Sequence, residues 1–183
     1  MVYFPFDKDA AQAAADFFTR QEGGRINKMK LVKLMYIAER TSLQETESPV
    51  FGGTYCSLAY GPVISEVLDA LNGNYWPGLV LQQYNVALAD GKQPSQDALS
   101  EWGRELIARV YAQFGAMDQW TISEWTHREF AEWHDPGKGH REMISIRDIV
   151  PEGGEALEEL AGELTYLRLY SPAYWRAPAA PAT

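Results

Sequence analysis

The stretch KLVKLMYIAER, from Lys30 to Arg40, is apolar around almost its whole circumference when it is drawn as a helix. Apolar side chains occupy one face at helical spacing and most of the opposite face as well; they are Leu31, Val32, Leu34, Met35, Tyr36, Ile37 and Ala38. A helix that is apolar on all sides is buried among its neighbours. The stretch therefore predicts a buried central helix over about residues 28–41, with Asn27 as its N-cap.

Capping residues and apolar periodicity predict the helices around this one. They are expected from Asp7 or Asp9 to Arg20, from Pro62 to Gly73, from Ser95 to Phe114, from the capping box of Thr121 and Glu124 onward, from Ser145 to Val150, and over residues 155–170. In the last of these we expect a buried leucine stripe and a solvated acidic face. The stripe comprises Leu157, Leu160, Leu164 and Leu167, and the acidic face comprises Glu155, Glu158, Glu159 and Glu163.

Strand signals are fewer. Residues 54–60 (TYCSLAY) favour a strand, with a helix left open, and residues 79–88 (LVLQQYNVAL) favour a small hairpin. The predicted fold class is therefore mainly α (α+β): a compact multi-helix domain around the buried central helix, with a small β-hairpin or short sheet. We expect one domain over residues 1–170, followed by a mobile Pro/Ala-rich tail over residues 171–183.

Composition and charge narrow the classes of function. The 183 residues are 46% apolar and carry a formal net charge of −9. No apolar run reaches the length of about 18 residues that spans a membrane, and the N-terminus lacks the basic start of a signal peptide, so a cytoplasmic protein is expected. An acidic chain is unsuited to direct nucleic-acid binding, which needs Lys and Arg, and it favours basic partners.

The single cysteine, Cys56, could in principle act as a nucleophile with one of the three histidines as its base. A lone cysteine in an apolar segment is more often a small buried hydrophobe. The glycine pairs lack the context of a phosphate-binding loop. We therefore expect no enzyme and no cofactor.

A metal site is also unexpected. His127 and His134 are seven residues apart, so one helix would hold them about 10 Å from each other, too far for a shared zinc ion. His134 and His140 flank a turn and could converge, with Asp135 or Glu132 as a third ligand. Surface or capping roles explain these histidines more simply.

Three tryptophans lie close to the histidines in the sequence. Trp120, Trp125 and Trp133 fit either packing in the core or anchoring of a protein interface, where tryptophan is enriched. Considered by its chemistry alone, the sequence favours an interaction module over an enzyme.

Three blocks of the sequence resemble those of one family. KLVKLMYIAE resembles the start of the SocA-like antitoxin domain, also called the Panacea domain. AYGPVISEVLDAL is similar to its aromatic-Gly-Pro-Val block, and ISEWTHREFAEW is similar to its Thr-His block, which follows a long helix. The blocks occur in the expected order, and the resemblance covers roughly Ile26 to Val150.

The resemblance implies the antitoxin of a bacterial or phage toxin–antitoxin pair, which neutralises a cognate toxin encoded beside it by direct protein contact. An alternative is an adaptor or regulatory module that delivers a partner protein to a protease or acts in a prophage programme. We expect exposed aromatics, polar groups at the Gly-Pro turn and acids of the last helix to bind the partner. The candidate residues are Tyr60, Gly61, Pro62, Trp76, His127, Trp133, Glu155, Glu158 and Glu159.

The same signature residues also have structural interpretations. Gly61-Pro62 fixes a chain reversal, Thr126 can bond a nearby carbonyl, and His127 fits a buried histidine whose hydrogen bonds are satisfied.

Overall fold

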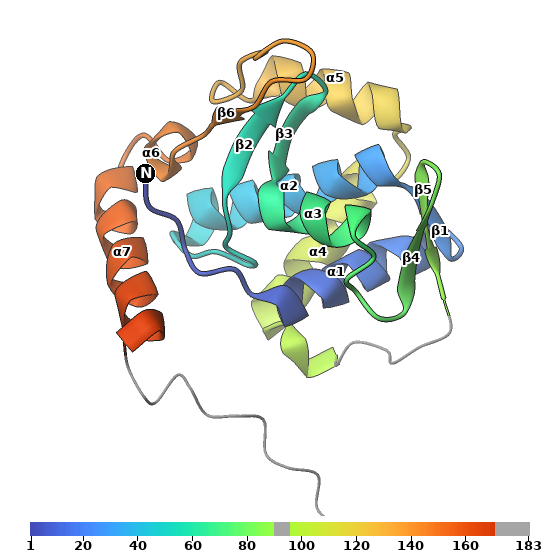
Figure 1. Cartoon of the computed structure of the whole chain (residues 1–183), viewed down its shortest axis with the longest axis horizontal. Helices are drawn as coiled ribbons and strands as arrows, with labels where there is room; N and C mark the ends of the chain where they lie inside the picture. Colours follow the sequence, from blue (N-terminus) through green and yellow to red (C-terminus); the bar gives the residue numbers. More distant parts are fainter. Residues whose placement is uncertain (90–95, 171–183) are drawn as a thin grey trace, which may run out of the picture.

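The helix predicted at the centre of the fold lies there. In the computed structural model, which describes residues 1–89 and 96–170, α2 (Lys28–Thr46) runs through the middle of the molecule (Figure 1). It contacts helices on several sides and the strand β3. Its fully buried apolar side chains are Leu31, Leu34, Met35, Tyr36, Ala38 and Leu43. Asn27 caps it as expected, and it continues to Thr46, beyond the expected end near residue 41.

The other helices surround α2. They are α1 (Lys8–Gln21), α3 (Ser65–Asn72), α4 (Glu101–Phe114), α5 (Gln119–Glu129), α6 (Ile146–Ile149) and α7 (Gly154–Tyr170), with one 3-10 turn, η1 (Gln96–Ala98). Asp7 caps α1, and Ser145 caps α6 through a capping box with Asp148. Together with the sheets, these elements confirm the mainly helical α+β class.

The starts of α5 and α4 differ from the prediction. The capping box of Thr121 and Glu124 is wrong, because the Asp118 carboxylate accepts hydrogen bonds from the backbone amides of Trp120 and Thr121 and so begins α5 earlier. Ser100 caps α4. The cap expected at Ser95 lies outside the described residues, as does the tail over residues 171–183.

Two small antiparallel sheets flank the helical core. One has the order β1-β5-β4, from Arg25–Asn27, Asn85–Leu88 and Leu79–Gln82, and includes the predicted hairpin. The other has the order β3-β2-β6, from Gly61–Ile64, Tyr55–Leu58 and Glu142–Met143. Residues 54–60 therefore contain a strand and not a helix.

Pro62 was expected in the first turn of a helix, and this is wrong. It lies in β3 opposite Ser57, and α3 begins only at Ser65. β3 is an edge strand of its sheet, where the missing N–H of a proline removes no bond to a further strand.

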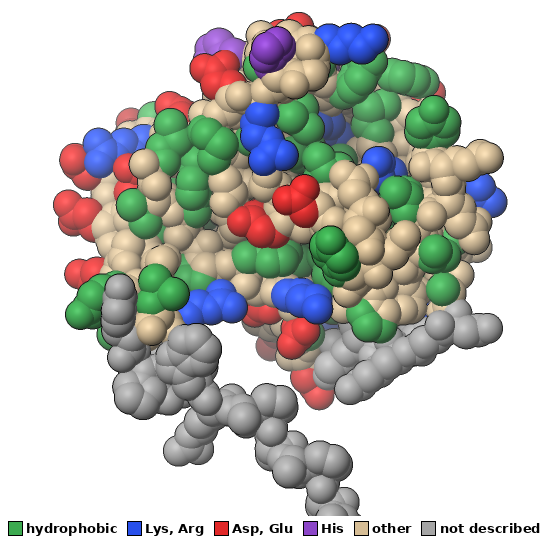
Figure 2. All heavy atoms as spheres, in the orientation of Figure 1, with side chains coloured by type: hydrophobic (Ala, Val, Ile, Leu, Met, Phe, Trp, Pro, Cys, Tyr) green, Lys and Arg blue, Asp and Glu red, His purple; other side chains and the backbone are tan. Residues whose placement is uncertain are grey.

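The last helix, α7, packs differently from the prediction. Leu157 and Ala161 are buried, whereas Leu160 and Leu167 are each 44% exposed, so the expected leucine stripe is only partly inside. The cause is that α7 packs on α6 and the N-terminal segment, away from α2 (Figure 1). Figure 2 shows acidic side chains along its outer edge, with basic side chains among them. Among the described residues, no helix is both long and apolar enough to cross a membrane.

Candidate functional site

Residues from all three sequence blocks meet at the turn between β2 and β3. Gly61 has φ +98° in this turn, and a Cβ atom there would lie 2.8 Å from Oγ1 of Thr126 and 2.9 Å from Nζ of Lys33. Only glycine combines this backbone conformation with so close an approach. We call the contact of Lys33, Gly61 and Thr126 the Gly61 junction; it joins α2, the β2–β3 turn and α5.

Lys33 is the charged group of the junction. Its side chain is buried, with the residue 1% exposed, and Nζ donates a hydrogen bond of 2.8 Å to the carbonyl of Pro62. Burial lowers the pKa of Lys33 to about 7, against a smaller opposite effect of Cys56. At neutral pH the amine is therefore only partly protonated. Its hydrogen bond to Pro62 attaches the β2–β3 turn to α2.

Two hydroxyl groups complete the junction on the side of α5. Oγ of Ser123 donates a hydrogen bond of 2.8 Å to the carbonyl of Tyr60. Oγ1 of Thr126 donates one of 2.8 Å to the carbonyl of Ser123 within the helix. The β2–β3 turn is thus hydrogen-bonded to α2 on one side and to α5 on the other.

His127 and Trp133 form a stacked pair next to the junction. Their ring centroids lie 3.7 Å apart with planes within 3° of parallel, and Nε1 of Trp133 donates to the carbonyl of Leu58 over 3.0 Å. Nε2 of His127 is buried without a hydrogen-bond partner among the described residues. The expectation that both ring nitrogens of a buried His127 form hydrogen bonds is therefore not met. Burial lowers the pKa of His127, and the nearby Lys33 lowers it further, so the environment favours the neutral imidazole.

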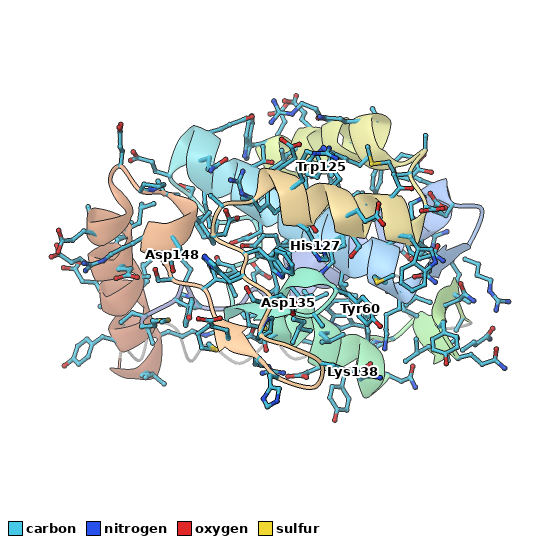
Figure 3. All side chains as sticks on the ribbon, turned by 90° about the horizontal axis from the view of Figure 1, so that it is seen from above. Tyr60, Trp125, His127, Asp135, Lys138 and Asp148 are labelled. Atoms are coloured by element: carbon cyan, nitrogen blue, oxygen red, sulfur yellow. The ribbon has the colours of Figure 1, made fainter. Side chains whose placement is uncertain are left out.

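Tyr60 and Trp120 cover the outer side of the turn. Tyr60 is 56% exposed and Trp120 is 55% exposed, and their ring centroids lie 6.0 Å apart in an edge-to-face arrangement. Figure 3 looks onto α5 and labels Tyr60, His127, Asp135 and Lys138. For Trp120 the sequence left open either packing in the core or a place in a protein interface, and its exposure excludes full burial in the core. It lies on one face of α5 with Glu124 and His127, at i, i+4 and i+7.

From the candidate set, the structure brings together Tyr60, Gly61, Pro62, His127 and Trp133. Trp76 does not lie with them on the surface. Trp76 was expected to be exposed, and it is only 2% exposed. It lines a small internal void between α3 and the β4–β5 hairpin, because these elements close over it. It belongs to the core and not to a partner surface.

The candidate glutamates lie elsewhere, on α7, which is separated from α5 in the views of both Figure 1 and Figure 3. Arg147 of α6 approaches Glu158 at 2.7 Å and Glu155 at 3.4 Å. Glu159 lines an open cavity together with Arg147. The acidic face of α7 is therefore partly neutralised by the chain itself.

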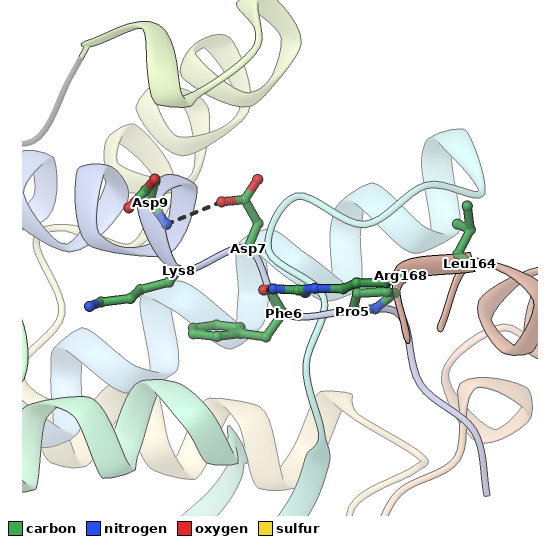
Figure 4. Close-up of a pocket in the computed structure, with 7 residues that line it drawn as sticks. All are labelled: Pro5, Phe6, Asp7, Lys8, Asp9, Leu164 and Arg168. Carbon is green, nitrogen blue, oxygen red and sulfur yellow. Dashed lines mark hydrogen bonds between the residues drawn. The ribbon is translucent and has the colours of Figure 1, made fainter. Parts of the chain in front are cut away.

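Another open cavity, of about 590 Å³, lies between the N-terminal segment and α7 (Figure 4). The lining residues are Pro5, Phe6, Asp7, Lys8, Asp9, Leu164 and Arg168. Asp7 is engaged in capping α1, and Nη1 of Arg168 donates to the carbonyl of Phe6. These contacts join α7 to the body of the protein.

The cysteine and the possible metal ligands do not form a reactive site among the described residues. Cys56 is fully buried in β2 with Sγ 3.9 Å from Oγ of Ser65, and burial raises the pKa of its thiol. Over residues 1–89 and 96–170, no three or more His, Cys, Asp or Glu side chains gather in a group that could hold a metal ion.

Comparison with known proteins gives one match. The model of the family described as "Antitoxin SocA-like, Panacea domain" matches residues 31–134, which is more than half of the 183 residues. No curated protein and no solved structure matches the chain. The matched segment begins in α2 and ends just after Trp133, so it contains the whole Gly61 junction and the stacked pair, and it excludes α7.

Proposed function

Because the chain belongs to the SocA-like antitoxin family with the Panacea domain, we propose that it is the antitoxin of a toxin–antitoxin pair and neutralises its toxin by direct protein contact. The observation that carries the proposal is the family match over residues 31–134. That segment includes Gly61 with Lys33 of α2 and Thr126 of α5, which both approach it closely and so connect these helices to the β2–β3 turn.

The charge of the chain supports such a role. A toxin that acts on nucleotides or RNA needs a basic cleft to bind them. A partner with a net charge of −9 would approach that cleft with complementary potential, which speeds the encounter and disfavours wrong partners. We expect the association rate to fall as salt is added, because salt screens attraction between exposed charges.

Growth rescue tests the proposal. The reading frames on either side of the gene are expressed singly in a bacterial host, and one that stops growth is then expressed together with this chain. We expect growth to resume and the two proteins to co-purify as a complex. If no neighbouring product is toxic, or if co-expression fails to restore growth although this chain is folded and abundant, the proposal is wrong.

A purified system separates masking from delivery to a protease. With only the toxin and this chain present, masking predicts that toxin activity disappears at about one antitoxin per binding site. Delivery predicts that the toxin stays active until a protease is added. We propose masking, in the cytoplasm, with the toxin as the partner.

We also propose that neutralisation needs no catalysis by this chain. The variant Cys56→Ala, which removes the buried thiol, should neutralise the toxin as well as the unchanged chain does. Metal analysis of the purified protein should find no stoichiometric ion. Loss of neutralisation by a folded Cys56→Ala protein would instead favour a catalytic role.

A further inference from the structure

Two large aromatic rings stand next to each other on the surface above the Gly61 junction. More than half of Tyr60 and of Trp120 is exposed, and the rings touch edge to face with centroids 6.0 Å apart. Adjacent exposed aromatics are typical of residues that anchor a protein interface, where Trp and Tyr contribute most of the binding energy. We call this pair the Tyr60–Trp120 platform.

The backbone that carries the platform is held in place on both sides. The carbonyl of Tyr60 accepts a hydrogen bond from Ser123, and the next residue is the tightly packed Gly61. Trp120 lies in the first turn of α5, where the Asp118 carboxylate accepts a hydrogen bond from its backbone amide. A surface that is already ordered loses little conformational freedom on binding, which favours affinity.

Exposed carboxylates lie on α5, at its N-cap and on the loop that follows Trp133. Asp118, Glu124 and Asp135 are all exposed, and Glu124 follows Trp120 by four residues on the same face of α5. Burial lowers the pKa of His127 most, and Lys33 lowers it too, whereas the hydrogen bond with the backbone of Tyr60 and then Asp135 and Glu124 act in the opposite direction.

Most of the positive charge near the platform already has a partner. Lys30, whose charge acts on Asp118, is paired with Glu22 at 2.5 Å and donates to the carbonyl of Gly115. Lys33 is buried beneath the turn and bound to a carbonyl. Arg128 on α5 is paired with Glu129 at 2.7 Å. Lys138 is exposed on the loop that follows Asp135, further from α5 in Figure 3. The platform therefore combines aromatic faces with an excess of carboxylates.

We propose that the Tyr60–Trp120 platform is the docking site for an arginine-bearing segment of the toxin; this deepens the proposed function and rests on it. A guanidinium group stacks on aromatic rings and donates paired hydrogen bonds to a carboxylate, both of which the platform offers. A lysine ammonium should bind this site more weakly, because it is more strongly hydrated and lacks the planar pair of N–H donors that a guanidinium presents.

Short synthetic peptides test the docking site without the toxin. The first peptide alternates arginine with glycine, and matched peptides carry lysine or glutamate in place of arginine. Binding is followed by NMR through the indole N–H signal of Trp120, which the variant Trp120→Ala identifies by its loss. We expect the arginine peptide to bind more tightly than the lysine peptide, and the glutamate peptide to leave the signal unmoved.

Variants locate the binding. Tyr60→Ala should weaken the arginine peptide by about two- to fivefold, as loss of an exposed cation–π contact does. Glu124→Gln should weaken it by a similar factor. The matched controls are Tyr84→Ala, at a tyrosine that is 77% exposed elsewhere, and Glu159→Gln on α7; neither should change the affinity. Equal effects of Tyr84→Ala and Tyr60→Ala, or equal binding of the arginine and glutamate peptides, would overturn the docking site.

The toxin gives the second readout. Trp120→Ala, confirmed as folded by its thermal transition, should weaken the complex by about thirtyfold or more, as removal of an anchor residue does. If the toxin binds the Trp120→Ala and unchanged proteins equally, the docking site is wrong although the proposed function stands. If no neighbouring product is neutralised, the proposed function is wrong, and the peptides alone decide the docking site. A dimer that Trp120→Ala converts to a monomer would overturn the proposal, because a second copy would then be the occupant.

Discussion

The buried amine of Lys33 leads to a prediction of how stability depends on pH. The group is 1% exposed, it has a hydrogen bond to Pro62, and its pKa falls from the ordinary value of 10.5 to about 7. Below about pH 7 the amine is protonated in both the folded and the unfolded chain, so it adds no pH dependence. Between about 7 and 10.5 the unfolded chain holds a proton that the folded chain lacks, so the free energy of unfolding rises with pH.

The magnitude follows from the two pKa values. The interval from about 7 to 10.5, at about 1.4 kcal/mol for each pH unit, corresponds to about 5 kcal/mol. Lys33→Met keeps an unbranched chain of similar length and removes the titrating group. The wild-type protein should therefore gain stability relative to Lys33→Met as pH rises through this interval. Near pH 6 the variant should be the more stable protein, because it avoids burying a charge and loses only the hydrogen bond to Pro62.

Urea denaturation of both proteins between about pH 6 and pH 10 measures this difference. The control is Lys8→Met, which removes a lysine that is exposed in the folded chain and leaves the Lys33 amine in place. A flat difference for Lys33→Met over the same range would refute the reasoning. It would show that the amine reaches water or a counter-charge in the folded protein.

Three further variants test the packing around the site. Glu39→Ala should lower the free energy of unfolding by about 4 kcal/mol or more in urea titrations, because the buried carboxylate accepts hydrogen bonds from the amides of residues 50–52 and from the Tyr55 hydroxyl. Gly61→Ala should cost about 1–3 kcal/mol in the same titrations, because a methyl group would strain a backbone at φ +98° and press on two side chains; a neutral result would contradict the close approach. Asp7→Ala should cost about 1 kcal/mol in urea titrations through loss of the α1 cap, and an unchanged value would refute that role.

The features that the sequence predicted correctly are mostly those determined by residues close together along the chain. The position of α2 follows from the apolar run between Lys30 and Arg40, and its start follows from the hydrogen bonds of the Asn27 side chain to amides two and three residues on. The β4–β5 hairpin and the cap of α6 are equally local. Each is fixed by side chains or backbone groups only a few residues apart, so a single sequence contains the necessary information.

The failures have tertiary causes. Pro62 suits the first turn of a helix or an edge strand equally well, and only the pairing of β3 with β2 decides between them. Leu160 and Leu167 fit a buried stripe, but α7 has too few neighbours to cover them. Trp76 resembles an interface anchor in the sequence, and α3 and the β4–β5 hairpin enclose it.

The site could be predicted only in part. The three blocks were identifiable as blocks, but nothing in their spacing places Nζ of Lys33 next to Gly61 and Thr126. The packing of α6 against α7 likewise decides where the α7 glutamates lie. It separates them from the β2–β3 turn and brings them into contact with Arg147. Contacts between residues far apart in sequence require the folded chain.

The arrangement also suggests how such a domain can change partners. Lys33 and Thr126 are buried and lie against Gly61 inside the matched segment, so replacing any of the three disturbs the scaffold. Tyr60 and Trp120 project outward from that scaffold, and substitutions at exposed positions usually change stability by about 0.5 kcal/mol or less. The interior can therefore remain the same while the outer side of the turn and of α5 varies. If the proposed docking site is right, exchanging the exposed side chains above the Gly61 junction should change which toxin is bound and leave the scaffold intact.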